Sequence, residues 1–213
     1  MIQKLDDTCT LHNGVKMPGF GFGTWQSAAG DITVSAVKAA VKAGYRNIDT
    51  AAAYHNEKSV GEGIRQAVED YGIKREELFI STKLWNDHRG YDLAMKAFEA
   101  SMKELGLEYL DLYMIHWPAV SKWHEDWREI NRSTWKAHVL EKIAAKHGKT
   151  TAHICLRWLI QKDIIPLPKS VHEERIISNT QVFDFELSAS DMAEIDAVPY
   201  CGGMRFDPDA ARS

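Results

Sequence analysis

The sequence is poor in cysteine and has neither a long apolar run nor an excess of basic residues. Its cysteines, Cys9, Cys155 and Cys201, are odd in number and far apart, which argues against a disulfide framework and favours a reducing compartment. No apolar run approaches the ~20 residues of a membrane span, and the N-terminus lacks the pattern of a secretory signal. The net charge of −4 gives no electrostatic case for binding nucleic acid or an anionic membrane. These absences predict a cytoplasmic globular protein.

The sequence patterns of common cofactor and metal sites are also missing. Residues 19–25 (GFGFGTW) lack the third glycine of the dinucleotide fingerprint G-x-G-x-x-G. His124-Glu125 is not followed by the second histidine of a zinc-binding helix. The sequence therefore predicts no metal site.

The first half of the chain alternates short apolar runs with amphipathic helical patterns. After a hairpin signal at Asn13-Gly14, strands are expected over 19–25, 46–49, 77–83 and 110–116. Helices are expected from a cap at Asp31, from Asn56 to Gly72, and up to Gly106. Four such repeats predict a parallel sheet with right-handed crossovers.

This rhythm breaks after His116. Residues 117–137 contain four tryptophans among charged residues and are expected to form a long loop leading into a helix. Helices are expected over 139–147, 151–162, 172–179 and 187–198, with a fifth buried strand over 164–170. Because no linker is visible, we expect one domain over residues 1–213.

Three polar residues end successive predicted strands. Asp49, Lys83 and His116 are 34 and 33 residues apart, and a (β/α)₈ barrel allots roughly 31 residues to each unit and places its chemistry at the carboxyl ends of its strands. The spacing predicts an α/β fold of this barrel type. Because closure takes eight strands and only five are expected, the barrel is incomplete, with an apparent internal deletion of about 75 residues near 137–138.

The residue types at this rim are suited to proton transfer. A tyrosine such as Tyr54 is a poor acid at neutral pH, but a nearby ammonium lowers its pKa and a carboxylate can hold that ammonium in place. A neighbouring imidazole can orient a carbonyl oxygen. Asp49, Tyr54, Lys83 and His116 are therefore the candidate catalytic residues.

Five segments resemble signature segments of the aldo-keto reductase family, of the prokaryotic type similar to 2,5-diketo-gluconate reductases. They are NIDTAAAYHNE (47–57), ISTKLW (80–85), MIHWP (114–118), GFGTW (21–25) and IPLPKSVHEER (165–175). The resemblance implies a TIM barrel that transfers a hydride from NADPH to a carbonyl of an aldehyde, ketone or sugar-like dicarbonyl. It also implies that Tyr54 is the general acid, tuned by Lys83 and Asp49, and that His116 orients the substrate.

The resemblance further implies a set of binding residues. Thr24 would lie beside the nicotinamide, and three tryptophans would line the substrate pocket: Trp25, Trp85 and Trp117. The adenosine end of NADPH would be held by Lys169, Ser170, Arg175 and Asn179, whose two cations favour NADPH over NADH. Ser178 departs from the family pattern, in which many relatives carry a glutamate that contacts the adenine.

The apparent deletion leaves alternatives open. By resemblance, strands five to seven are absent, together with the residues that hold the carboxamide, the nicotinamide and the pyrophosphate. The chain is therefore either an active reductase or a catalytically silent relative that binds ligand without turnover. A complete barrel would be a monomer, whereas the open edges of a truncated one could lead to a homo-oligomer. A phosphate-binding isomerase is less well supported, because no carboxylate base occupies the expected positions.

Overall fold

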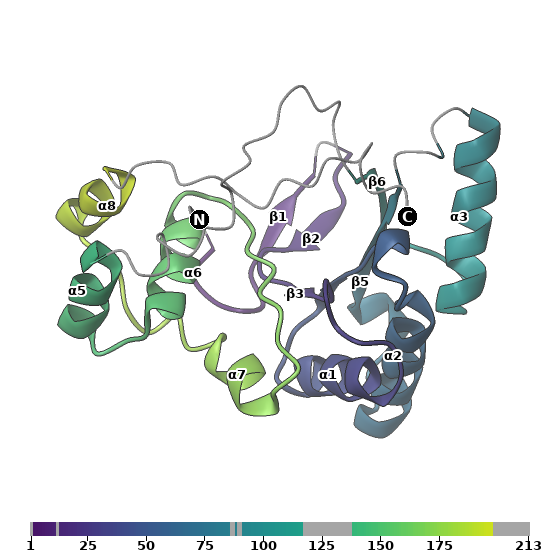
Figure 1. Ribbon diagram of the computed structural model, residues 1–213, viewed down its shortest axis with the longest axis horizontal. Coiled ribbons are helices and arrows are strands. Elements are labelled where there is room, and N and C mark those ends of the chain that lie inside the picture. The colour runs from purple at the N-terminus through teal and green to yellow at the C-terminus, as the bar shows by residue number, and fades with distance from the viewer. Residues whose placement is uncertain (1, 12, 86–87, 89–90, 117–137, 198–213) are drawn as a thin grey trace.

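A four-stranded parallel sheet forms the centre of the molecule (Figure 1). The computed structural model describes the chain except for residues 1, 12, 86–87, 89–90, 117–137 and 198–213. The strand order is β3-β4-β5-β6, which is also their order along the chain. Their bounds are β3 Phe22–Gly23, β4 Asn47–Asp49, β5 Phe79–Leu84 and β6 Leu112–Ile115. The predicted hairpin precedes them, with β1 Thr8–Thr10 antiparallel to β2 Lys16–Pro18.

The two faces of this sheet carry different kinds of side chain, because neighbouring residues of a strand point to opposite sides. Asp49 of β4 is paired in register with Ser81 of β5, and the two side chains are hydrogen-bonded on one face. Ile48 and Ile80, one residue earlier on each strand, are fully buried in the main apolar core. The polar face therefore carries the candidate catalytic groups, while the apolar face holds the helices in place.

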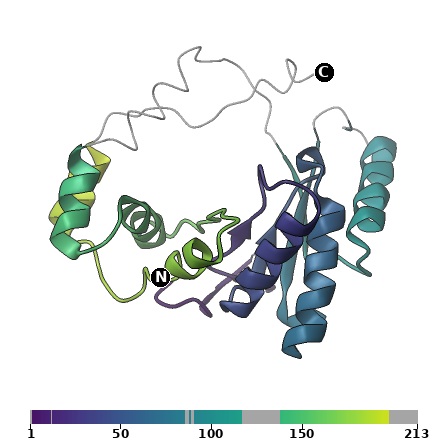
Figure 2. The same cartoon turned by 60° about the horizontal axis from the view of Figure 1, so that its bottom comes forward.

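Three helices cover the apolar face, as Figure 2 shows: α1 (Asp31–Lys42), α2 (Glu57–Tyr71) and α3 (Tyr91–Leu105). Their extents confirm the predicted helices, except that α1 is capped by Gly30 and not by Asp31. Gly61 lets α2 approach α3 closely, since a Cβ there would lie 1.8 Å from the backbone oxygen of Leu105. This close packing on α3 holds the first half of α2 in position, next to the carboxyl edge of the sheet.

The described residues of the second half of the chain form the helices α5 (His138–His147), α6 (Thr151–Gln161), α7 (Glu173–Ser178) and α8 (Ala189–Asp196). Their positions agree with the predicted ones. Helix α7 packs against α1, and the Tyr45 hydroxyl donates a hydrogen bond to the Ile176 carbonyl at 3.1 Å. Helices α5 and α6 share a smaller apolar core with Leu187.

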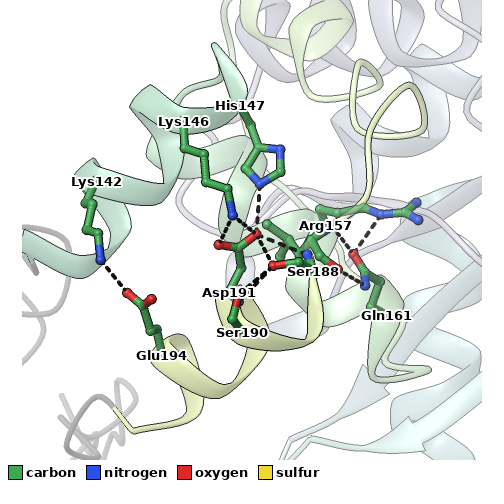
Figure 3. Close-up of polar contacts among 10 residues, drawn as sticks. Lys142, Lys146, His147, Arg157, Gln161, Ser188, Ser190, Asp191 and Glu194 are labelled. Atoms are coloured by element: carbon green, nitrogen blue, oxygen red, sulfur yellow. Dashed lines mark hydrogen bonds and ion pairs between the residues drawn. The ribbon is translucent and has the colours of Figure 1, made fainter.

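Asp191 fastens α8 to α5 (Figure 3). Its buried carboxylate accepts hydrogen bonds from the Lys146 ammonium at 2.8 Å and from Ser188, and it lies 3.0 Å from His147 Nε2. Burial raises the pKa of this carboxyl, but the bonds from Lys146, His147 and Ser188 outweigh it and hold the pKa well below its usual range. Asp191 is therefore ionised at neutral pH and serves as an anchor for the last described helix.

The segment predicted as a fifth strand, 164–170, is extended beside β3 but does not form a regular strand. The Gly21 and Gly23 N–H groups donate to the carbonyls of Pro166 and Pro168 at 3.1 and 3.3 Å. Two prolines in this segment lack the N–H that a ladder needs, so it can accept hydrogen bonds at these positions but not donate them. Within the described residues, the sheet therefore has four parallel strands and an extended segment in the fifth place, which is compatible with part of a (β/α)₈ barrel.

Candidate active site

A buried ion pair joins the ends of β4 and β5. The Lys83 ammonium donates to Asp49 Oδ2 at 2.5 Å and to the Thr50 carbonyl at 2.8 Å. The other carboxylate oxygen of Asp49 accepts a hydrogen bond from the Ser81 hydroxyl at 2.9 Å. Only 7% of the Asp49 side chain and 14% of the Lys83 side chain are exposed. The pair is therefore held on several sides and is largely shielded from water.

Tyr54 lies directly beside this pair. It ends the 3₁₀ helix η1 (Ala52–Tyr54), which follows β4, and the Lys83 ammonium lies 5.2 Å from the centre of its ring. His116, just after β6, packs its ring edge-to-face on Tyr54, with centroids 5.4 Å apart. Four residues from three successive strand ends thus meet at one edge of the sheet, as the sequence spacing predicts.

The acid–base properties of Tyr54 differ from the expectation that Lys83 would lower its pKa. Burial, reinforced by the negative charge of Asp49, raises the pKa of Tyr54 well above its usual value. The Lys83 ammonium lies over the ring, 5.2 Å from its centroid, and is paired with Asp49. Tyr54 is therefore fully protonated at neutral pH, which is the form that a proton donor needs.

His116 is a neutral imidazole at physiological pH. Burial, together with the nearby positive charge of Lys83, lowers its pKa to about 4. Its ring also packs edge-to-face on Trp85, with centroids 5.1 Å apart. A neutral imidazole has one N–H group that can donate a hydrogen bond to an oxygen, which suits a group that orients a carbonyl.

Asn56 is a residue whose sequence context indicates only the start of a helix. It occupies the N-cap position of α2, but its side chain makes no capping hydrogen bond. Instead the buried amide donates to the carbonyls of Thr24 and Ser27, both at 2.9 Å, and accepts from the Thr50 hydroxyl at 3.2 Å. The one signal in the sequence is an asparagine two residues after the candidate acid.

Two of the three tryptophans proposed for the substrate pocket are described by the structure. Trp25 is half-buried just after Thr24, at the carboxyl end of β3, and Trp85 is half-buried against His116. Trp117 lies outside the described residues. Among the described residues, no group of three or more His, Cys, Asp or Glu side chains could hold a metal ion.

The residues proposed for the cofactor lie at the same edge of the sheet. Thr24 is buried, and its hydroxyl donates to the Asp49 carbonyl at 3.1 Å. Lys169 and Ser170 follow Pro168, which is bonded to Gly23. Because Gly23 is hydrogen-bonded to Pro168, Lys169 and Ser170 lie next to Thr24, on the side of β3 that faces away from β4.

The adenosine end of the proposed cofactor site is formed around α7. The side chains of Lys169 and Arg175 are exposed. Asn179 caps the C-terminal end of α7, and Ser178 bonds to His153 Nε2 through its hydroxyl at 2.9 Å. The serine that replaces the usual glutamate is thus engaged by a histidine of α6.

Comparisons with known proteins show which family the chain resembles. The Aldo/keto reductase family model matches residues 19–136 and 120–199. The chain is 37% identical to the glyoxal reductase of Bacillus subtilis (strain 168) over 265 aligned positions, which cover 93% of this chain and 95% of that protein. This alignment is longer than the 213 residues of the chain, so part of the relative has no counterpart in it.

Two solved structures are similar in fold. An aldo/keto reductase from Brucella melitensis gives a TM-score of 0.76 at 32% identity and covers 92% of this chain and 98% of its own. A Bombyx mori aldo-keto reductase in complex with NADP gives 0.77 at 28% identity, covering 92% and 93%. The chain belongs to the aldo-keto reductase family of oxidoreductases, whose fold is the α/β TIM barrel.

Proposed function

We propose that this protein reduces the carbonyl group of a small aldehyde, ketone or sugar-like dicarbonyl with NADPH, and that Tyr54 is the general acid. The observation that carries the proposal is the cluster at the carboxyl edge of the sheet. It combines a protonated phenol, a neutral imidazole and a buried ion pair within one group of contacts. The name of the glyoxal reductase supports a small dicarbonyl as the substrate class.

Each residue of the cluster has a distinct proposed role. His116 orients the carbonyl oxygen by donating a hydrogen bond, and Tyr54 gives its proton to that oxygen as negative charge develops on it. An alkoxide is a stronger base than a phenolate, so the proton moves readily even from a phenol with a high pKa. The Lys83 ammonium then lies 5.2 Å from the ring that has lost its proton, and Asp49 keeps it there.

The residues at the adenosine end fit a phosphorylated cofactor. When bound, NADPH supplies the hydride for the carbonyl carbon. The exposed Lys169 ammonium and Arg175 guanidinium offer two positive charges to a phosphate group, and Ser170 and Asn179 add hydrogen-bonding groups nearby. Thr24 is proposed to line the nicotinamide side. No further residue is assigned to the carboxamide or the pyrophosphate, because the family segments that supply those contacts are absent.

Substitution of Tyr54 tests the proposal. Tyr54→Phe removes the proton but keeps the ring that packs on His116, so turnover of a simple aldehyde is expected to be lost while NADPH still binds. The measurement is NADPH consumption by absorbance, together with NADPH binding by fluorescence. Near-normal turnover in this variant would refute Tyr54 as the acid.

The proposal extends to the organisation of the chain. We propose a single domain over 1–213 in which barrel strands five to seven are deleted near 137–138, a junction outside the described residues except for His138. The surplus of aligned positions in the glyoxal reductase supports this. No helix in the described part of the chain is long and apolar enough to cross a membrane. A cytoplasmic location and the oligomeric state remain predictions.

The silent alternative predicts a different result for the wild-type protein. A folded sample that binds NADPH but does not oxidise it with a generic aldehyde would favour a relative without turnover. An intact mass near 24.1 kDa would establish that the tested chain consists of these 213 residues and contains no additional barrel segment. The mass therefore has to be measured on the same sample as the activity.

A further inference from the structure

The side chain of Asn56 forms the centre of a buried network next to Tyr54. Only 1% of this residue is exposed. An asparagine at the start of a helix usually caps it by accepting a backbone N–H, but the Asn56 side chain does not. A buried polar side chain that does not cap its own helix is expected to form hydrogen bonds with other parts of the protein.

The hydrogen bonds of Asn56 connect two loops at the carboxyl edge of the sheet. Its amide group donates to the carbonyls of Thr24 and Ser27, which belong to the loop after β3. Its oxygen accepts from the Thr50 hydroxyl, which follows β4. Both donors and the acceptor of the amide are therefore used, and all of them bind groups that surround the candidate site.

Thr50 extends the network to the ion pair. Its hydroxyl donates to Asn56 while its carbonyl accepts the Lys83 ammonium at 2.8 Å. Lys83 in turn lies against the ring of Tyr54. Asn56 is thus linked through one residue to the cation that contacts the proposed proton donor.

The residue between Tyr54 and Asn56 has an unusual backbone conformation. His55 has a φ of +54°, in the left-handed region that residues other than glycine seldom adopt. Two backbone hydrogen bonds close the short helix η1 before it, from Tyr54 N–H to the Ala51 carbonyl and from His55 N–H to the Ala52 carbonyl. Asn56 directly follows this left-handed residue, so the hydrogen bonds of its side chain hold the same segment that carries Tyr54.

We propose that Asn56 is a positioning residue: by tying the Tyr54 segment to the loop of Thr24 and Ser27, it sets the distance between the proton donor and the place where the carbonyl is reduced. This inference rests on the proposed function, because it assumes that Tyr54 is the acid and that Thr24 lines the nicotinamide side. Asn56 acts through these neighbours and is assigned no contact of its own with substrate or cofactor.

The test compares Asn56→Ala with Asn47→Ala. Asn47 is also a fully buried asparagine, and it bonds to the Pro18 carbonyl at 3.2 Å from the start of β4, away from Tyr54. We expect Asn56→Ala to lower kcat about 100-fold, because a misplaced catalytic group costs about this much, with little change in NADPH affinity. We expect Asn47→Ala to lower the melting temperature without lowering kcat. Equal effects of both variants on kcat, or none of either, would overturn the proposal.

A milder variant covers the case in which Asn56→Ala does not fold. Thr50→Val keeps the volume of the side chain but removes the hydroxyl that holds the Asn56 oxygen. The expected result is a decrease of kcat that is smaller than the decrease in Asn56→Ala, with KM for NADPH unchanged. A folded Thr50→Val protein with wild-type kcat would count against the network.

A second readout separates this inference from the proposed function. The phenol of Tyr54 can be titrated by ultraviolet difference absorbance, with Tyr54→Phe subtracted, and a pKa above the usual value reports the buried position of the ring. Asn56→Ala is expected to move this pKa toward 10, because a displaced ring becomes hydrated. If Tyr54→Phe is fully active, the proposed function fails; if Tyr54→Phe is inactive but Asn56→Ala has wild-type kcat and phenol pKa, only the positioning role fails.

Discussion

The ion pair between Asp49 and Lys83 can be tested by a double-mutant cycle on stability. Both side chains are largely buried, so removing one partner leaves the other charge without compensation in a poorly hydrated place. In Asp49→Asn the ammonium keeps the Thr50 carbonyl and an amide oxygen as acceptors but loses the negative charge that compensates it. In Lys83→Met the carboxylate keeps only the Ser81 hydroxyl.

The geometry sets the expected magnitudes. Breaking a buried pair by removing one partner costs about 3–5 kcal/mol of the free energy of unfolding, and we expect each single variant to fall in this range. The double variant removes both charges and should cost less than the sum of the singles, with a coupling energy of about 2 kcal/mol or more. An exposed pair provides the contrast: Asp6→Asn, which removes the partner of Lys4, should change stability by less than about 1 kcal/mol.

Urea unfolding followed by tryptophan fluorescence measures all four corners of the cycle. The reasoning depends on burial, and it predicts that the two single effects are not additive. Additivity within about 0.5 kcal/mol would mean that the two groups are hydrated and do not depend on each other, and it would refute the buried pair.

Three further predictions concern titration and packing. His116 has a pKa lowered to about 4, so its NMR signals should not titrate between pH 5.5 and 8. Because the folded pKa lies below the unfolded value of about 6.5, its contribution to stability is present above pH ~6.5 and is lost as the pH falls toward 4, a loss that His116→Asn should remove. Asp191→Asn should lower the free energy of unfolding by about 2–3 kcal/mol, since it weakens the bonds from Lys146 and His147 that hold α8 (Figure 3); an unchanged urea midpoint would contradict this anchor. Gly61→Ala should cost about 1–3 kcal/mol by pushing α2 from α3, which thermal unfolding would detect.

The sequence predicted the helices whose ends are set by nearby residues. It did not predict features that depend on hydrogen-bond partners elsewhere in the chain. The ends of α2 and α3 follow from Gly72 and Gly106, whose φ angles of +63° and +61° suit glycine and stop a helix. The segment 164–170 has the apolar composition of a strand, yet its prolines remove the donors that a ladder needs. The role of Asn56 could not be predicted, because its hydrogen-bond partners lie about 30 residues earlier in the chain.

The sequence by itself determined that Asp49, Lys83 and His116 meet at one edge, because parallel strands repeated at a regular spacing bring their carboxyl ends together. It also determined the family, through the segments around these residues. Only the tertiary structure decided the protonation states, since these depend on burial and on which charges become neighbours. It placed Lys83 over the Tyr54 ring, where burial and Asp49 together raise the pKa of the phenol, and it made Asn56, an apparent helix cap, a link between the strand ends.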